Sequence, residues 1–136
     1  MDTIRKADYY YTIAPDKPGE GARILDVFRR AGVNLLAFHA FPSARKSQLD
    51  FVPADGIAFV AAAKAAKLKL SKPKTVFLID GDDRVGAMAG LLGRLGAAKI
   101  NVTAVEGICA AGGRYGALLW VKPRDVGKAG SVLGAL

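Results

Sequence analysis

Apolar positions along the chain switch between a period of two and a period of three to four, which predicts strands and helices in turn. Aromatic and β-branched residues crowd residues 7–14 and predict a strand that ends at Pro15. After a polar turn rich in glycine and proline, apolar residues recur at helical spacing, at Ile24, Val27, Phe28 and Ala31. The pattern therefore predicts a strand, a turn and an amphipathic helix that Gly32 ends.

The remainder of the first half continues this order. Residues 33–42 and 48–53 predict two strands joined by a polar turn, which is the pattern of a hairpin. Residues 54–67 are rich in alanine and predict a helix with Asp55 near its start. The short apolar segment 68–71 predicts a last strand, so the complete order is strand, helix, strand, strand, helix, strand.

The same order begins again at residue 74. Turn and core residues of the two halves align without a gap, as Asp16 with Asp83, Gly19 with Gly86, Ile24 with Leu91, Phe28 with Leu95 and Asn34 with Asn101. Because turn and core positions recur together, the pattern indicates an internal repeat. In the second copy the last predicted helix reaches Leu136, so its final strand is predicted to be absent. The sheet edge left open is expected to be covered by a partner chain.

These elements predict an α+β protein of two ferredoxin-like βαββαβ units in tandem, each an antiparallel sheet with two helices on one face. The predicted division is 1–71 and 72–136. The helix of the second copy carries a glycine at every third position, at Gly90, Gly93 and Gly96. Glycine weakens a helix unless it permits close approach, so we expect this stripe to pack against a neighbouring helix.

Composition narrows the function. The chain has 136 residues, and 51% of them are hydrophobic, as in globular proteins. The formal net charge is +8, but the basic residues are dispersed, which is typical of a solvated surface. No apolar run is long enough to span a bilayer, and the first residues do not resemble a signal peptide. We expect a cytoplasmic protein without membrane contact.

Enzymatic chemistry is not predicted. His39 is the only histidine and Cys109 the only cysteine, so the chain cannot form an internal disulfide. Neither residue lies in the spacing of a catalytic triad or of a metal site. The sequence predicts no catalytic residues, no bound metal and no cofactor.

The first turn reads Asp16-Lys17-Pro18-Gly19, and the helix that follows leads into Val33-Asn34-Leu35 at the next strand. This pattern resembles the ACT domain, a small module that senses amino acids, in which the first turn reads Asp or Asn, any residue, Pro and Gly. The resemblance extends from residue 7 to 121, although Val85 stands where proline is usual. It implies a ligand site where the first turn meets the start of the second strand, often where two such domains meet. The matching positions are Asp16, Pro18, Gly19, Asn34, Leu35, Asp83, Val85, Gly86, Asn101 and Val102.

Such a site suits a zwitterion. An Asp carboxylate accepts from an ammonium group, an Asn amide serves either end, and the amides at a helix start suit a carboxylate. We therefore predict a regulatory module that binds a free amino acid at the interface between units. It is expected to signal through a change of assembly or of partner contact, as a homodimer that acts on a separate enzyme or transporter.

Two alternatives stay open. The aspartates, glycines and asparagines of the turns have purely structural uses in turns and helix caps, which favours a ligand-free interaction module of the same fold. An RNA-binding protein is the other alternative, because residues 76–81 and 114–120 partly resemble the motifs of RNA-recognition modules. Ala117 occupies the place of a stacking aromatic, so nucleic acid is not expected as a partner.

Overall fold

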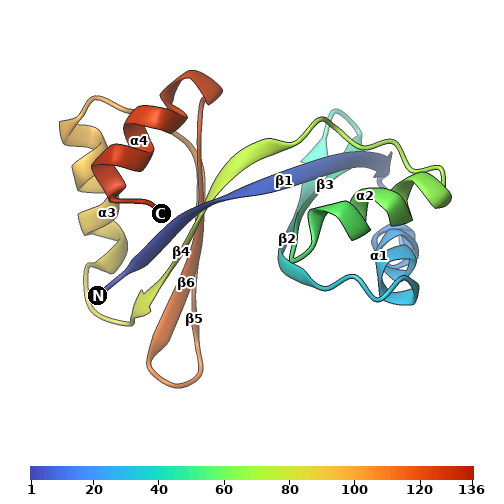
Figure 1. Cartoon of the computed structure of the whole chain (residues 1–136), viewed down its shortest axis with the longest axis horizontal. Coiled ribbons are helices and arrows are strands. Elements are labelled where there is room, and N and C mark those ends of the chain that lie inside the picture. Colours follow the sequence, from blue (N-terminus) through green and yellow to red (C-terminus); the bar gives the residue numbers. More distant parts are fainter. The chain divides into compact units, whose positions relative to one another are not determined.

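The computed structural model describes all residues, 1–136, and consists of two compact units. The first unit is Asp8–Lys74, and the second unit combines Met1–Ala7 with Thr75–Leu136. In each unit two helices cover one face of an antiparallel sheet (Figure 1). This is the predicted α+β, ferredoxin-like fold in tandem.

The first unit is built around a central strand. Its elements are β1 (Thr3–Pro15), α1 (Glu20–Arg30), β2 (Leu35–Ser43), β3 (Lys46–Pro53) and α2 (Gly56–Ala65). β3 lies between β1 and β2 and is antiparallel to both. The core between sheet and helices is largely aromatic: Phe28 stacks on Phe59 with ring centroids 4.2 Å apart, and Phe51 packs beside them. The apolar face predicted for α1 thus supplies the core, with Ile24 and Phe28 fully buried.

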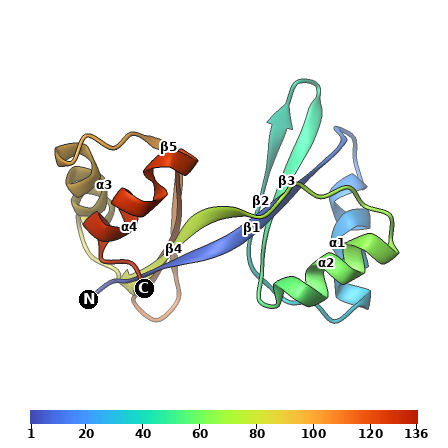
Figure 2. The same cartoon turned by 45° about the horizontal axis from the view of Figure 1, so that its top comes forward.

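The second unit repeats this plan. Its elements are β4 (Lys74–Asp82), α3 (Ala87–Ala97), β5 (Val102–Ala110), β6 (Arg114–Val121), a 3₁₀ turn (Pro123–Asp125) and α4 (Val126–Leu133). β6 lies between β4 and β5 and is antiparallel to both. Leu91 and Leu95 of α3 pack with Phe77 and Leu119 of the sheet in an aliphatic core. Figure 2 shows both helices of this unit on the same side of its strands.

The fourth strand of the second unit comes from the start of the chain. No strand follows α4, and β1 is the neighbour of β4 in the sheet. The Leu136 amide donates to the Ile4 carbonyl at 2.9 Å, and Ile4 is buried in the core of this unit. The edge that was expected to need a partner chain is therefore covered by residues 3–7 of the same chain. This corrects the predicted division, which placed residues 1–7 in the first unit.

The predicted last strand of the first unit, residues 68–71, does not form a regular strand. The segment still runs along β1, since the Ser71 amide donates to the Tyr11 carbonyl at 2.8 Å. The return bond uses a side chain, because the Tyr11 amide donates to Ser71 Oγ at 2.9 Å. Thr12 Oγ1 likewise donates to the Lys69 carbonyl at 2.7 Å. Residues 68–71 therefore pair with β1 partly through side chains, and the regular main-chain ladder that defines a strand is incomplete.

The glycines of α3 have open space beside them. A Cβ atom added at Gly90, Gly93 or Gly96 would meet no atom within 4 Å, so this glycine stripe does not pack against the other helix of its own unit. None of the helices has both the length and the apolar character that crossing a bilayer requires.

Candidate functional site

Strand register separates the predicted site residues of the second unit into two groups. Asp82 of β4 and Ala110 of β5 both lie opposite Arg114, so the turn after β4 is at the end of the sheet where β5 finishes. Val102, at the start of β5, lies opposite Val121 at the other end. The eleven residues of α3 span about 16 Å between these ends. Within this unit the turn does not meet Asn101.

The first unit has the same geometry. Pro15 and Ser43 both lie opposite Lys46, whereas Leu35 lies opposite Pro53. In the turn, Ser47 Oγ donates to the Asp16 carboxylate at 3.2 Å. At the opposite end, the Asn34 carbonyl accepts from the Ala54 amide at 2.9 Å. The turn and the start of the second strand are thus separate groups in each unit, and a site that uses both stays a prediction.

The glycine of each turn has a conformational role. Gly19 has a φ of 90° and Gly86 a φ of 81°, in the left-handed region that favours glycine. Each immediately precedes its helix, and no side chain caps the helix start. The first amides, of Glu20 and Ala87, donate to the Lys17 and Arg84 carbonyls at 3.4 and 3.3 Å. The two helix starts differ in charge, because α1 carries Glu20 in its first turn and α3 carries no acidic residue there. The positive end of α3 is therefore not compensated by a side chain of its own first turn.

A cavity of about 460 Å³ opens beside the start of α3. It lies between the turn after β4, the first turns of α3 and the second half of β5, with Tyr115 of β6 also in its wall. Its apolar lining includes Met88, Leu92, Val105 and Ile108. Of the predicted site residues, Asp83 and Gly86 border this cavity, whereas Asn101 and Val102 do not. Val85, next to the lining residues, is fully exposed.

Asp83 connects the turn to the edge strand. Its main-chain amide donates to the Gly113 carbonyl at 2.9 Å, and its carboxylate accepts from the Cys109 thiol with Sγ and Oδ1 3.3 Å apart. This hydrogen bond raises the pKa of Cys109. Because the thiolate is the reactive form of cysteine, a raised pKa lowers the reactivity of the Cys109 thiol.

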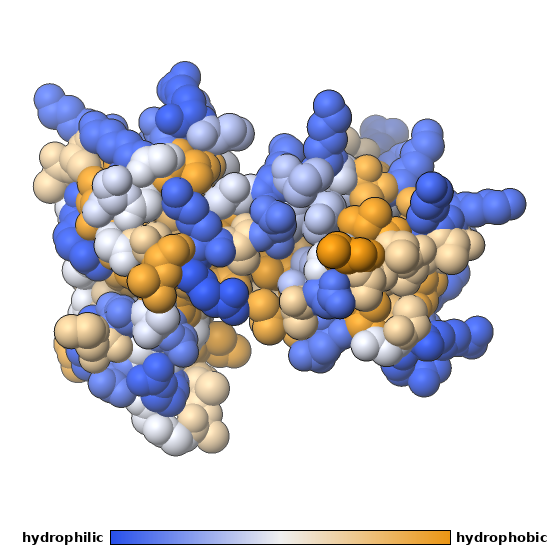
Figure 3. All heavy atoms as spheres, in the orientation of Figure 1, coloured by the Kyte–Doolittle hydropathy of each residue, from blue (hydrophilic) through white to orange (hydrophobic).

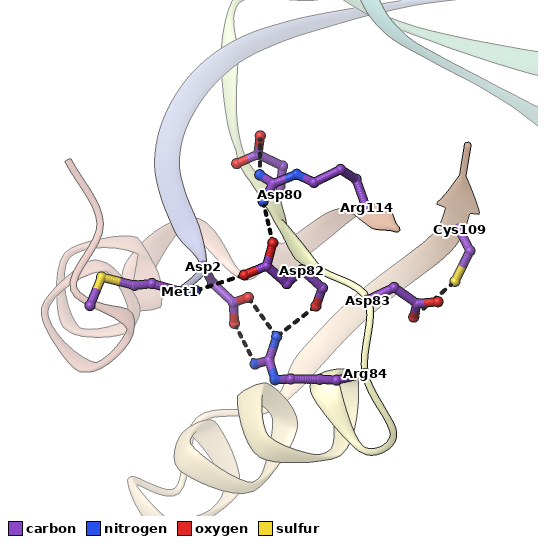
Figure 4. Close-up of polar contacts among 8 residues, drawn as sticks. All are labelled: Met1, Asp2, Asp80, Asp82, Asp83, Arg84, Cys109 and Arg114. Carbon is purple, nitrogen blue, oxygen red and sulfur yellow. Dashed lines mark hydrogen bonds and ion pairs between the residues drawn. The ribbon is translucent and has the colours of Figure 1, made fainter. Parts of the chain in front are cut away.

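The other side of the turn is held by ion pairs (Figure 4). Arg84 donates to both carboxylate oxygens of Asp2, each at 3.0 Å, and to the Asp82 carbonyl at 3.0 Å. Arg114 donates to the carboxylate of Asp82 at 2.9 Å and to that of Asp80 at 3.3 Å. Arg84 lowers the pKa of Asp2, and Arg114 lowers the pKa of Asp82.

Sequence reasoning did not find Asp2, Arg84 or Arg114. The partners Asp2 and Arg84 are 82 positions apart, and no local pattern marks them. One signal was available: Arg84 lies inside the predicted turn, beside Asp83. No group of three His, Cys, Asp or Glu side chains is placed to hold a metal ion. The cavity thus offers one carboxylate, one guanidinium and the start of a helix around an apolar lining.

The strand order and the glycine-led turns define a tandem pair of ferredoxin-like units. The structure is similar to protein BT0572 from Bacteroides thetaiotaomicron, with a TM-score of 0.81 and 19% identity over 98% of this chain and 88% of that one. It is also similar to the ligand-free regulatory subunit of aspartate kinase from Thermus thermophilus, with a TM-score of 0.64 and 12% identity over 98% and 94%. Aspartokinase III from E. coli, in complex with aspartate and ADP, matches over 97% of this chain and 32% of that one, with a TM-score of 0.55 and 13% identity.

These similarities establish the fold. The sequence matches no family model, and no curated protein is significantly similar to it. The structural neighbours include regulatory subunits and domains of aspartate kinase, whose fold is that of the ACT domain. The chain therefore has the ACT-domain fold, as the resemblance of its first turn predicted.

Proposed function

We propose that this protein is a regulatory module that binds a free α-amino acid in the cavity of the second unit. The observation that carries the proposal is the position of the cavity, which combines the uncapped start of α3 with the Asp83 carboxylate on one short turn. A cavity of about 460 Å³ is within the usual size of small-molecule sites.

Each end of the ligand has a counterpart there. The ammonium group is bound by the Asp83 carboxylate, which is exposed and already accepts one hydrogen bond from Cys109. The ligand carboxylate is bound at the start of α3, where the amides and the positive end of the helix dipole favour an anion. The Arg84 guanidinium also borders this end of the cavity, where it is paired with Asp2.

The regulatory role is supported by the kind of protein that shares the fold. Several similar structures are regulatory subunits or regulatory domains, and the chain corresponds to only 32% of aspartokinase III. We propose that the protein is not an enzyme and that occupancy is transmitted to a separate enzyme or transporter. A ligand site between units, a homodimer and a cytoplasmic location stay predictions.

The test is thermal unfolding of the full chain with each of the twenty amino acids at millimolar concentration. A ligand that binds only the folded protein stabilises it by RT ln(1 + [L]/Kd), about 2.7 kcal/mol at one hundred times Kd. We expect a rise with a small group of amino acids, lost in Asp83→Asn. Asp16→Asn, at the equivalent position of the first unit, is the matched control and should retain it. No rise with any amino acid contradicts the proposal and favours a ligand-free interaction module.

A further inference from the structure

We infer that the cavity of the second unit takes an amino acid with an apolar side chain, of the size of valine, leucine, isoleucine or methionine. The inference rests on the proposed function and names the class of its ligand. Three features support it: the apolar side chains that line the cavity, the two charged residues at its edge, and the lack of accessible neutral hydrogen-bonding side chains.

The lining is apolar on both sides. Met88 and Leu92 of α3 lie on one side, partly buried against the core of the unit. Val105 and Ile108 of β5 lie on the other, and they are 39% and 73% exposed. A ligand side chain between these two walls removes apolar surface from water on the protein as well as on itself, which favours binding.

The cavity stays open because β5 has a glycine at its centre. A Cβ atom at Gly107 would lie 3.5 Å from Met88 Sδ, so a side chain here would fill the space beside the helix. With glycine, no side chain of β5 projects into the cavity at this position.

The charges in the lining match one zwitterion and no more. Asp83 and Arg84 are the only charged residues that line the cavity. Asp83 is assigned to the ligand ammonium, and Arg84 is already paired with Asp2. A lysine or glutamate ligand would bring a further charge into the cavity without an opposite charge to receive it, and an unpaired charge removed from water is costly.

The neutral polar side chains of the lining, Cys109 and Tyr115, do not present a free hydrogen-bonding group to the open part of the cavity. The Cys109 thiol donates to Asp83. The Tyr115 hydroxyl is buried without a hydrogen-bond partner, and its pKa is raised by burial and by the nearby Asp2 carboxylate. Because this oxygen is buried, it is not exposed in the open part of the cavity. A serine or threonine hydroxyl would lose water without gaining a partner of good geometry.

The experiment is isothermal titration of the full chain with leucine, isoleucine, valine, methionine, alanine, serine, lysine and glutamate. Affinity for the best aliphatic ligand is expected to exceed affinity for alanine and serine at least tenfold, since each methylene in an apolar pocket contributes about tenfold or more. 3-Methylbutylamine and 4-methylpentanoate, which each lack one charged end of leucine, should bind at least tenfold more weakly than leucine.

A conservative variant tests whether the β5 side of the cavity contacts the ligand side chain. Ile108→Thr keeps a β-branched residue on the exposed edge strand and should weaken leucine binding at least threefold while leaving alanine binding unchanged. Ile13→Thr, the same change at a 47% exposed strand position of the first unit, is the matched control and should leave both unchanged. Tightest binding by lysine, glutamate or serine, or an Ile108→Thr variant with unaltered leucine affinity, overturns the inference and leaves the proposed function standing. No binding by any amino acid overturns the proposed function itself.

Discussion

Arg84 and Asp2 form a two-bond ion pair: Nη1 and Nη2 of the guanidinium each lie 3.0 Å from one carboxylate oxygen. The pair joins the first residues of the chain to the turn that borders the cavity. Together with the hydrogen bond from the Leu136 amide to the Ile4 carbonyl, it holds the start of β1 against the second unit. The start of the chain is thus a structural part of the unit formed by its end.

The first prediction concerns this ion pair. Asp2→Asn should lower the free energy of unfolding by about 1 kcal/mol, because the pair is two-bonded but Arg84 is partly exposed to solvent. Urea unfolding at pH 7 measures the change. Asp8→Asn, at an exposed position of the same strand, is the control and should change stability by less than about 0.5 kcal/mol. Equal effects of the two variants would show that the pair contributes nothing specific.

The same pair predicts a pH dependence. Arg84 holds the pKa of Asp2 below its ordinary value of 3.8. For an acid with a lowered pKa in the folded protein, the added stability is present above the ordinary pKa and disappears as the pH falls through the folded value. The stability difference between wild type and Asp2→Asn should therefore be full at pH 6 and should shrink below pH 3.8. Urea unfolding of both proteins between pH 6 and pH 2 measures this difference. A difference that stays constant with pH would contradict a lowered pKa of Asp2 in the folded protein.

Gly81 should be necessary for the docking of Asp2. A Cβ atom at Gly81 would overlap the Asp2 carboxylate and come within 3.0 Å of the Tyr115 ring. Gly81→Ala is expected to displace Asp2 from Arg84 and to destabilise the protein by about 1 to 3 kcal/mol, the usual cost of overpacking. Gly116→Ala on β6 is the matched control, since its Cβ would meet only the Ile79 carbonyl at an ordinary 3.8 Å. Thermal unfolding measures the stability of both variants. If Gly116→Ala is destabilised as much as Gly81→Ala, Gly81 has no specific role in the docking of Asp2.

Asp55 should stabilise α2 as its N-cap. The Asp55 carboxylate accepts from the Ala58 amide at 3.1 Å, as the sequence predicted for a helix that starts beside this residue. Asp55→Ala removes this bond and should cost about 1 kcal/mol, while Asp55→Asn keeps a good cap and should stay close to wild type. Both values come from urea unfolding, and a loss of the same size in both variants would point to charge and not to capping.

The glycines of α3 predict an increase in stability. A Cβ at Gly90 or Gly93 would meet no atom, so alanine there removes the conformational cost of glycine without a clash. Each substitution should add up to about 1 kcal/mol to the free energy of unfolding. Gly86→Ala, at the left-handed position just before the same helix, should instead destabilise. A loss of stability in Gly90→Ala would mean that these positions face a partner, as the sequence pattern first indicated.

The local elements could be predicted because their causes are local. The spacing of Ile24 and Phe28 determines the buried face of α1, and Gly19 and Gly86 permit the left-handed turn that precedes each helix. Asp55 caps α2 through a bond to a residue three positions away. The internal repeat, and through it the ferredoxin-like fold, follows from such short-range patterns recurring in the same order.

The candidate site could be predicted only in part. Asp83 and Gly86 were predicted because they belong to the turn, and both border the cavity whose far wall is β5. Asn101 lies at the other end of the unit, a separation that depends on strand register and on the length of α3. Linear spacing between a turn and a strand does not reveal which end of the sheet each one reaches.

Only the tertiary structure decided which strand completes the second sheet. The sequence placed residues 1–7 with their neighbours in the chain, and the pattern of alternating residues there is equally compatible with either unit. The choice depends on contacts with distant residues: Ile4 in the core beside Phe77, Asp2 in the space left by Gly81, and the bond to Leu136. Hydrophobic periodicity determines that a strand forms and which face it buries, but the partner of an edge strand is determined by complementary surfaces that come together only in the folded protein.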